Sequence, residues 1–399
     1  MRIKRSLCLL MCLIFAFLFT CPAFAEETDD VCLRARDDGS FHILLITDTQ
    51  DTDNPQKLTL QLLNAELDAA DVDLVIFLGD NIYGPHVGED HDKAAAAISA
   101  IIEPVVDKGL PFAVCFGNHD DEDCISKEEL LAIYKSFPEC LNDDPDIPGV
   151  GNTCLPIYGT DSDSPSILLW VIDSGTYAEE ETSKYAYVKE EQIQWFREGI
   201  SSFTNFDRPV SYAFQHIPVP QVTDLIEPAA KFSKGGFCIF GSPFGEWYRE
   251  KEGAVSEGRF SEIPCPPTID SGEFQAWKDN GLKAAFFGHD HTNDYIATID
   301  GIDLVATCGL GFYSYGRGDE HGARLLVLHT DRPEEYETQM VYYKDLIDKP
   351  ISIFRAPHIG AQFAKILYPI IAAVVVLIVA VIILVSVIRK KKRSRKRQG

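Results

Sequence analysis

The sequence predicts an α/β domain in which helices cover the faces of a largely parallel sheet, between a secretion signal and a membrane-spanning helix. Apolar runs of strand length alternate with segments of helical periodicity from residue 41 to residue 343, which is typical of βαβ units. The first 25 residues are basic and then apolar, and residues 366–388 carry no charge. Ligands of such folds bind beyond the carboxyl ends of the strands, so functional residues are expected there.

The expected strands and helices follow from the spacing of apolar residues along the chain, which differs between the two kinds of element. Strands are expected at residues 41–47, 73–79, 111–117, 166–173, 208–216, 282–288, 323–330 and 335–343. Helices are expected at residues 55–70, 92–109, 127–137 and 189–200.

Local signals indicate one helix start, one hairpin and two long connections. Ser126 and Glu129 form a capping box, which predicts that a helix begins there. Residues 295–307 predict a hairpin that turns at Asp300-Gly301, because this dipeptide favours the turn that joins two neighbouring strands. Residues 138–165 and 228–270 are rich in glycine and proline, and we expect a loop and a long loop insertion there.

The N-terminal 25 residues have the order of a secretory signal. Basic residues precede an apolar run that ends in Ala23-Phe24-Ala25, a small-residue cleavage pattern. A retained N-terminal anchor is the alternative. Residues 26–40 are expected to form a lead-in to the domain at 41–343.

The C-terminal region predicts a single membrane span. Residues 344–365 are expected to form a stalk, and 366–388 are long enough to cross the hydrocarbon core as a helix. The basic segment 389–399 follows, and such a flank belongs on the cytoplasmic side. The sequence therefore predicts a single-pass protein of the cell membrane with its N-terminal domain outside the cytoplasm.

Charge and cysteine usage narrow the functional classes. Residues 26–365 hold all 61 acidic residues but only 25 of the 36 basic ones, a formal charge of about −36. Such a surface repels nucleic acid, which we exclude as a partner. Disulfides are expected, because an even number of cysteines remains outside the signal without a CxxC pair: Cys32, Cys115, Cys124, Cys140, Cys154, Cys238, Cys265 and Cys308.

Polar residues of a restricted type follow five of the expected strands. The side-chain oxygens of aspartate and asparagine and the ring nitrogens of histidine are suitable ligands for borderline metals. A glycine precedes several of the clusters, at positions where the chain must turn sharply. Chance occurrence of GNHD and GHDH, in that order and each after a strand, is improbable. The clusters comprise Asp48 with Gln50, Asp80 with Tyr83, Asn118 with His119 and Asp120, His216, and His289 with His291.

At these residues the chain resembles the calcineurin-like metallophosphoesterases. The similarity runs from about Phe41 to His329, and "GDNIYGP", "QHIPVP", "GLKAAFFGHDHTNDY" and "GLGFYSYGRG" resemble the branch related to purple acid phosphatases. This resemblance implies a four-layer αββα sandwich and two metal ions per chain. Fe(III) paired with a divalent ion (zinc, manganese or iron) is the expected metal content.

The resemblance also implies roles for individual residues. Asp80 would bridge the two metals, with Asp48 and His291 on the first and Asn118, His216 and His289 on the second. His119 would stand over the phosphate and assist the departing oxygen, oriented by Asp120. A metal-activated hydroxide would attack the phosphorus in line.

One position departs from the superfamily pattern, because Gln50 stands where most members have histidine. Tyr83 is expected to replace that imidazole as a ligand, as in purple acid phosphatases, and a phenolate favours Fe(III). Alternatively, Tyr83 contacts the ligands or the substrate without binding metal. Gln50 is a candidate contact to the metal or to its water.

Three further residues are candidates for substrate contact: His86, Arg317 and His321. The function expected from all these features is a membrane-anchored, outward-facing phosphomonoesterase acting on a small phosphorylated substrate. A phosphodiesterase acting on nucleotides or lipid headgroups is the first alternative, and a non-catalytic surface binding protein is the second. No obligate protein partner can be inferred from the sequence.

Overall fold

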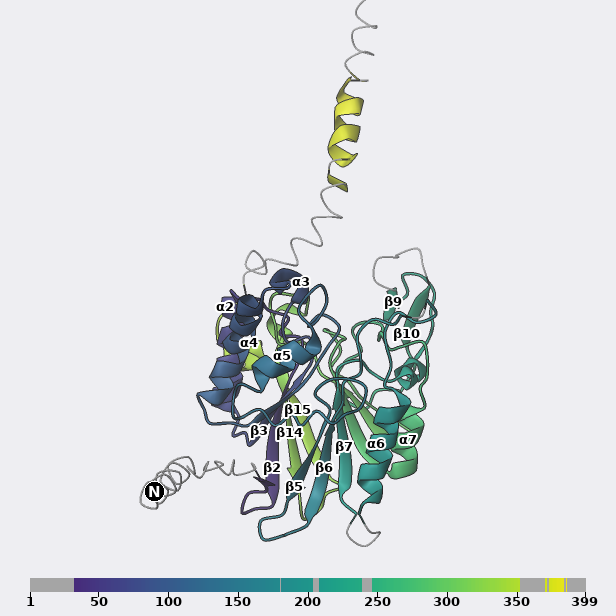
Figure 1. Cartoon of the computed structure of the whole chain (residues 1–399). Helices are drawn as coiled ribbons and strands as arrows, with labels where there is room; N and C mark the ends of the chain where they lie inside the picture. Colours follow the sequence, from purple (N-terminus) through teal and green to yellow (C-terminus); the bar gives the residue numbers. More distant parts are fainter. Residues whose placement is uncertain are drawn as a thin grey trace, which may run out of the picture. The chain divides into compact units, whose positions relative to one another are not determined.

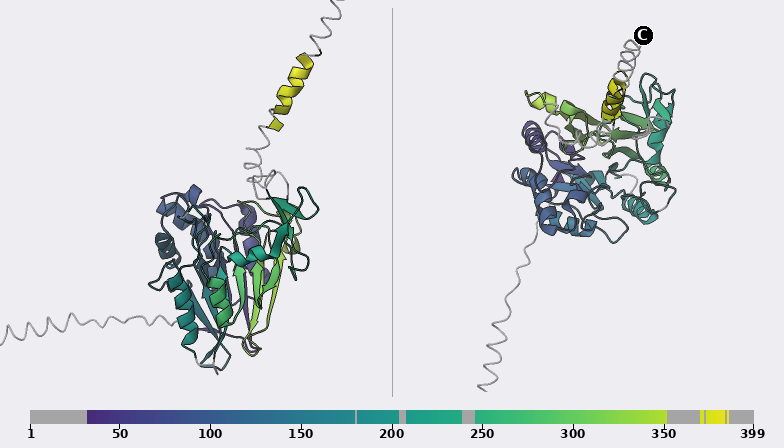
Figure 2. Two further views of the ribbon diagram at one scale, coloured as in Figure 1. Left: turned by 90° about the vertical axis from the view of Figure 1, so that its right-hand side faces the viewer. Right: turned by 90° about the horizontal axis from the view of Figure 1, so that it is seen from above.

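The computed structural model describes residues 32–179, 181–203, 208–238, 246–351, 370–371, 373–383 and 385. Two sheets lie between two groups of helices (Figures 1 and 2). The predicted signal, residues 352–365 of the predicted stalk and the predicted basic tail lie outside the described residues.

The first sheet has five strands and carries the N-terminal part of the domain. Strands β2, β3 and β4 run parallel, while β14 pairs antiparallel with β2 and β15 with β14. The spatial order is β15 (Tyr336–Tyr342), β14 (Gly322–His329), β2 (Ser40–Ile46), β3 (Leu74–Leu78) and β4 (Phe112–Cys115). The helices on its outer face are α2 (Lys57–Ala69), α4 (His91–Val106) and α5 (Lys127–Tyr134).

The second sheet has seven strands and mixed directions. Strands β6, β7, β11 and β13 run parallel at its centre. The spatial order is β1 (Leu33–Arg34), β5 (Thr153–Tyr158), β6 (Pro165–Val171), β7 (Val210–Gln215), β11 (Leu282–Phe287), β13 (Ile302–Ala306) and β12 (Ile296–Ile299). Its outer face is covered by α6 (Glu190–Ser201) and α7 (Glu273–Asn280).

Side-chain alternation along the strands explains the layers. In β2, Leu44 and Ile46 pack with α2 and α4, whereas Ile43 and Leu45 point the other way. Ile43 and Leu45 share a core with residues of β6, β7 and β11, such as Leu169. Because the central strands β2, β3 and β4 are buried on both faces, they are largely apolar rather than alternating. The result is the expected order of helices, sheet, sheet and helices.

Most of the expected elements are present, but helix α7 was not expected, and three expected segments differ. The expected loop 138–165 contains β5, which pairs antiparallel with β6. The expected loop insertion contains a three-stranded sheet built from β8 (Ile226–Pro228), β10 (Trp247–Glu250) and β9 (Gly236–Cys238). Helix α5 has the predicted capping box but ends at Tyr134 instead of Phe137.

Short elements complete the chain: α3 (Gly84–Val87), the 3-10 turns η1 (Pro220–Leu225) and η2 (Gly318–Glu320), and α8 (Tyr343–Leu346). Of the predicted 366–388 span, residues 370, 371, 373–383 and 385 are described and are helical. Within the described part of the chain, no helix has the length and apolarity needed to cross a membrane.

The described cysteines do not support the expected disulfides. Cys115 lies in β4, where its thiol donates to the carbonyl of Phe214, and Cys308 is buried. Among the described residues, six cysteines carry free thiols: Cys115, Cys124, Cys140, Cys154, Cys265 and Cys308.

Candidate metal centre

The predicted ligands lie at the carboxyl ends of five strands drawn from both sheets. Asp48 follows β2, Asp80 follows β3 and Asn118 follows β4 in the first sheet. In the second sheet, His216 follows β7, and His289 and His291 follow β11. Since the two sheets pack face to face, these loops meet at one end of the sandwich.

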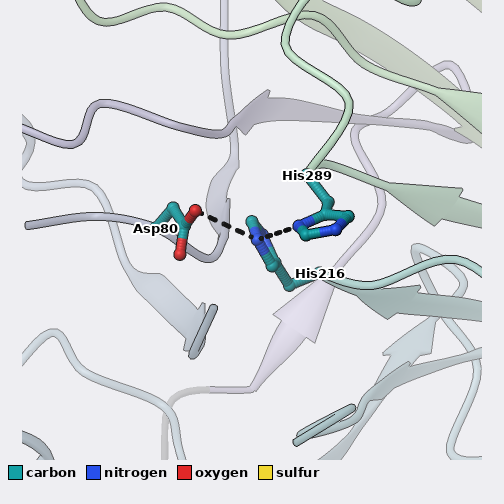
Figure 3. A group of neighbouring side chains, drawn as sticks. All are labelled: Asp80, His216 and His289. Atoms are coloured by element: carbon teal, nitrogen blue, oxygen red, sulfur yellow. Dashed lines mark hydrogen bonds and ion pairs between the residues drawn. The ribbon is translucent and has the colours of Figure 1, made fainter. Parts of the chain in front are cut away.

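Five of the predicted ligands converge in two groups that share one carboxylate. Asp80, His216 and His289 form one group, and Asp48, Asp80 and His291 form the other, with ligand atoms within 4.8 Å of one another in each. His216 Nε2 lies 3.3 Å from Asp80 Oδ2 and 3.3 Å from His289 Nδ1 (Figure 3). His291 Nε2 lies 3.2 Å from Asp48 Oδ1. Asp80 is thus placed to bridge two neighbouring ions.

Three of these ligands have a strained backbone conformation, which the surrounding packing must hold in place. Asp48, Asp80 and His289 have left-handed φ angles of 50°, 49° and 70°, which few non-glycine residues adopt. Gly79 lets the backbone after β3 approach His216 closely, because a Cβ atom at this position would lie 2.7 Å from the imidazole of His216. At Gly117 a Cβ atom would collide with the Asp80 carboxylate.

Several buried donor atoms fit a metal centre. Asn118 Oδ1 is buried and has no hydrogen-bond partner among the described residues, and Asp48 Oδ1 likewise accepts no hydrogen bond, although His291 Nε2 lies 3.2 Å away. Leaving a buried polar atom unsatisfied costs about 1–3 kcal/mol, so these two oxygens indicate a missing partner. Carboxylate, amide oxygen and imidazole together suit zinc, manganese or iron. The residues present therefore fit the two ions that the family binds.

Mutual electrostatics reinforce the cluster. Burial opposes ionisation of Asp80, but the charge of His216 and a hydrogen bond from the His119 N–H outweigh it and lower the pKa of the carboxyl. Burial likewise opposes protonation of His216, yet Asp80 raises the pKa of its imidazole to about 9. Burial and the charge of His216 lower the pKa of His289. Asp80 therefore favours a positive charge on His216, whereas His289 is kept neutral, which is the form of imidazole that binds metal.

The orientation of the ligands depends on neighbours that hold their other atoms. His216 Nδ1 lies 2.8 Å from the carbonyl oxygen of Leu78, and Thr47 donates to Asp48 Oδ2 at 2.7 Å. Such contacts set which ring nitrogen faces the metal.

His119 lies beside the ligand cluster and has a carboxylate partner that differs from the expected one. Its Nδ1 lies 2.5 Å from Glu122 Oε2. Asp120, the predicted partner, accepts hydrogen bonds from the backbone N–H groups of Gly117, Asn81 and Ile82 instead. Burial and the charge of Asp80 raise the pKa of Asp120 to about 7. Asp120 therefore stabilises the two ligand loops, and Glu122 orients the imidazole.

Tyr83 packs beside His119. Its ring lies 6.0 Å from that of His119 and 5.3 Å from that of Tyr313, and burial and the charge of Glu122 raise the pKa of its hydroxyl. The role of Tyr83 as a metal ligand stays a prediction, as does the alternative of a contact to the ligands or the substrate.

Gln50 contacts a ligand through its amide nitrogen. It is buried, and its Nε2 donates to Asp80 Oδ2 over 3.3 Å. This hydrogen bond orients the shared carboxylate, so Gln50 supports the site through Asp80.

Two of the three candidate substrate contacts are engaged elsewhere. Arg317 forms an ion pair with Asp294 and donates to the carbonyl of Thr292 at 2.9 Å. His321 is buried against Phe312, with ring centroids 4.3 Å apart, and burial lowers the pKa of its imidazole to about 3. Both side chains stabilise the fold and do not face a substrate.

His86 is the remaining candidate. It is exposed, and its Nε2 lies 3.0 Å from Asp53 Oδ1. Its ring contacts Tyr313, which in turn contacts Tyr83 beside His119. His86 is therefore connected to the site but separated from it by two aromatic rings.

Sequence reasoning missed the aromatic side chains that hold the ligands. Tyr315 stacks on His291 with centroids 4.2 Å apart, and its carbonyl oxygen lies 3.1 Å from His291 Nδ1. The Tyr315 hydroxyl donates to Glu262 at 2.8 Å. Tyr185 contacts His289 edge-on at 4.5 Å. These tyrosines come from irregular segments, where no periodic pattern marks a residue as part of a site.

Comparison with known proteins identifies the family. A family model described as calcineurin-like phosphoesterase matches residues 41–293. The chain therefore belongs to the calcineurin-like phosphoesterases, a family that binds two metal ions.

The most similar relatives resemble purple acid phosphatases. The Arabidopsis thaliana protein "Probable inactive purple acid phosphatase 14" is 29% identical over 346 residues, covering 79% of this chain and 82% of the relative. "Probable inactive purple acid phosphatase 28" from the same plant is 28% identical over 335 residues, covering 74% and 77%. "Phosphatase DCR2" of Saccharomyces cerevisiae is 27% identical over 238 residues, covering 57% of this chain and 37% of the yeast protein.

Proposed function

We propose that this protein is a metal-dependent phosphomonoesterase of the acid-phosphatase type. The observation that carries the proposal is the convergence of five ligand residues from two sheets on one shared carboxylate, Asp80. The buried oxygens of Asp48 and Asn118 that accept no hydrogen bond give this cluster the means to hold ions.

The chain's own residues would perform three tasks. Asp80 would be shared between the two ions, Asp48 and His291 would hold one of them, and Asn118, His216 and His289 would hold the other. When bound, the ions supply Lewis acidity that polarises the phosphate and activates water. Hydrolysis forms a bond from the water oxygen to phosphorus and breaks the bond to the ester oxygen.

His119 would give the departing oxygen its proton. Its side chain is 29% exposed, so a substrate can reach it, and Glu122 holds its Nδ1 and leaves Nε2 for the transfer. The contact with Glu122 fixes the orientation of the ring, so that Nε2 is the nitrogen presented to the departing oxygen.

A non-catalytic binding protein is the second candidate function. It is favoured by the hydrogen bond from Gln50 to Asp80, which places an amide beside the shared ligand. The names of the plant relatives, which call those proteins probably inactive, are consistent with it.

Metal analysis combined with two variants tests the phosphatase. Purified protein should contain two ions per chain and hydrolyse simple monoesters faster than diesters. Asp80→Asn should abolish turnover and lower metal content, because it removes the shared ligand. His119→Asn should lower kcat by about 10²–10⁴ while metal content is retained.

The matched control is His42→Asn. His42 lies in β2 of the same sheet, with its Nδ1 2.8 Å from the carbonyl of Asp71, away from the ligands. Full activity of either site variant would refute the assignment. Bound metal without turnover of any ester would support the binding protein.

We also propose that the protein is anchored by residues 366–388 with its catalytic domain outside the cytoplasm. Support comes from the uncharged segment and the basic residues that follow it. For the metals, the donor set supports zinc, manganese or iron, and Fe(III) would require Tyr83 as an additional ligand.

A further inference from the structure

A pocket lies between the start of α2 and the segment that follows α8, and none of the predicted metal ligands lines it. Its volume is about 820 Å³, within the range of about 300–1,000 Å³ that is typical of small-molecule sites. It is lined by residues 54–58, 61, 343 and 349–351, which include two lysines and no acidic residue. The pocket therefore differs in charge from the rest of the domain, which is strongly acidic.

The two lysines of this pocket are not neutralised by neighbouring carboxylates. Lys57 is the first residue of α2 and Lys349 lies after α8, and both are exposed. Neither side chain forms an ion pair or a hydrogen bond within the described part of the chain. Asp53 and Asp348 are close in the sequence but do not line the pocket. The pocket thus carries a positive charge that attracts an anionic group.

The first turn of α2 adds backbone donors beside Lys57. The N-cap residue, Gln56, makes no side-chain capping hydrogen bond, and the first turn contains no acidic residue. The N–H groups at the start of a helix lack intrahelical partners and carry a partial positive charge, which suits a bound anion. Asp51 accepts from the Gln56 N–H at 3.0 Å and so fixes the position of this turn.

A buried hydroxyl indicates a ligand independently of these charges. Tyr343 lines the pocket and is 1% exposed, and its hydroxyl has no hydrogen-bond partner among the described residues. An unsatisfied buried hydroxyl is unfavourable, and a ligand oxygen that accepts its hydrogen bond would remove this penalty. The residue is held in place, because its ring packs edge-on against Phe312 at 5.7 Å and its N–H donates to the carbonyl of His321 at 2.8 Å.

The remaining lining residues are largely apolar. Leu58 and Ile351 also pack against the core on the outer face of the first sheet, and Pro55 and Pro350 add further apolar surface to the pocket. An inorganic anion would leave this surface uncovered. The ligand that fits therefore has an apolar body as well as a negative charge.

We propose that this pocket is a second binding site, which takes an organic anion made of a carboxylate or phosphate on an alkyl body. Lys57, Lys349 and the first turn of α2 hold the charged group, and the Tyr343 hydroxyl donates to a ligand oxygen. Leu58 covers part of the alkyl body. The site does not depend on the proposed phosphatase function, because it shares no residue with the metal centre.

Lysine labelling read by mass spectrometry tests the site residue by residue. The full-length protein in phosphatidylcholine nanodiscs is acetylated with an amine-reactive ester in the presence of hexanoate, acetate or hexanol. Hexanoate at about ten times its Kd should slow the labelling of Lys57 and Lys349 about tenfold, because only the unbound fraction reacts. Acetate lacks the apolar body and hexanol lacks the charge, so both should protect far less. Lys93, an exposed lysine of α4, is the internal control.

Two variants connect the protection to the pocket. Tyr343→Phe removes the unsatisfied hydroxyl, so it should raise the Kd of hexanoate by about two- to tenfold without lowering the unfolding temperature. Lys57→Gln should raise the Kd read at Lys349 by about two- to fivefold. Lys93→Gln should leave it unchanged. Absence of protection, equal protection of Lys93, or a Kd that neither pocket variant changes would overturn the site. Equal protection by acetate would overturn the apolar part of the ligand.

A change of lipid distinguishes the two sources of such an anion, a membrane lipid and a soluble compound. Ile351 precedes the uncharged segment 366–388 by 15 residues, which span at most about 50 Å, so a proposed anchor there keeps the pocket near the bilayer. Protection of both lysines in phosphatidylserine nanodiscs without hexanoate would identify a lipid, and protection that still requires hexanoate would identify a soluble compound. Recovery of the protein outside the nanodisc fraction would refute the anchor alone, since protection by hexanoate does not depend on it.

Discussion

At the scale of single residues, the contact between His119 and Glu122 gives the most specific indication of how the proposed reaction would proceed. The two side chains are 2.5 Å apart, and Glu122 is the carboxylate that contacts this imidazole among the described hydrogen bonds. It acts on the substrate through His119, so it is a positioning residue. Its loss should therefore affect the proton transfer more than the binding of substrate.

We expect Glu122→Gln to lower kcat for alkyl phosphates by about 10- to 100-fold with little change in KM. The amide keeps the shape of the side chain but replaces the carboxylate that contacts Nδ1 and orients the imidazole. For esters with acidic leaving groups the loss should be smaller, because their oxygen departs without full protonation. Steady-state kinetics with a series of leaving groups measures both effects.

Glu129→Gln is the control for local loosening, because Glu129 caps the helix that follows the same loop. An equal fall in kcat for all leaving groups, or the same fall in the control, would contradict the positioning role of Glu122.

The sequence predicted the ligands better than it predicted their supports. Asp48, Asp80, His216, His289 and His291 were placed because strand ends in one fold class meet at one edge. Whether Asp120 or Glu122 reaches His119 depends on side-chain directions within a tight turn, which spacing alone does not determine.

At the scale of elements, helix α2 packs on the first sheet through a buried carboxyl group. Glu66 is 1% exposed, and its Oε1 accepts from the Ala323 N–H of β14 at 3.3 Å. Its Oε2 has no hydrogen-bond partner among the described residues. Burial, opposed by that hydrogen bond, raises the pKa of Glu66 to about 8.

This shift makes the junction between α2 and β14 sensitive to pH. Between the ordinary pKa of 4.5 and about 8, the folded protein keeps a proton at Glu66 that the unfolded chain has released. Stability therefore falls as pH rises through this range, by at most a few kcal/mol at about 1.4 kcal/mol per pKa unit.

Glu66→Gln should raise the unfolding midpoint at pH 8 and leave it nearly unchanged at pH 5, because the amide stays neutral at both. Thermal or urea unfolding at the two pH values measures this. Glu103→Gln, at an exposed position of α4, is the matched control. Equal effects at pH 5 and pH 8 would show that Glu66 does not titrate on unfolding.

The prediction of strands from the sequence failed where proline and glycine indicated a loop but pairing with neighbouring strands stabilised a strand. Strand β5 contains Pro156, which removes a backbone donor, yet the strand is tolerated because it pairs antiparallel with β6 and only briefly with β1. Strands β8, β9 and β10 form a small sheet although the surrounding segment has a composition typical of loops. The alternation of strands and helices along the chain did not reveal that there are two sheets. Buried parallel strands have the same apolar sequence pattern whether they belong to one sheet or to two.

At the scale of the whole molecule, charge is divided between the domain and the C-terminal tail. Residues 26–365 carry a formal charge of about −36, whereas 389–397 hold eight basic residues and no acidic one. The acidic domain would be repelled from anionic lipid, and the basic tail would be attracted to it. Opposite charges on the two sides of residues 366–388 thus favour one orientation in a membrane.

Deleting residues 366–399 should move the protein from the membrane fraction to the aqueous fraction without loss of phosphatase activity. The reason is that the candidate site and both sheets lie within residues 33–351, while the uncharged segment supplies the affinity for lipid. Carbonate washing followed by detergent extraction measures the partition of each form. A variant that lacks only residues 389–399 separates the two contributions: it should stay with the membrane but lose its uniform orientation in a protease-protection assay. Release of the full chain by carbonate alone would mean that the uncharged segment does not span the bilayer.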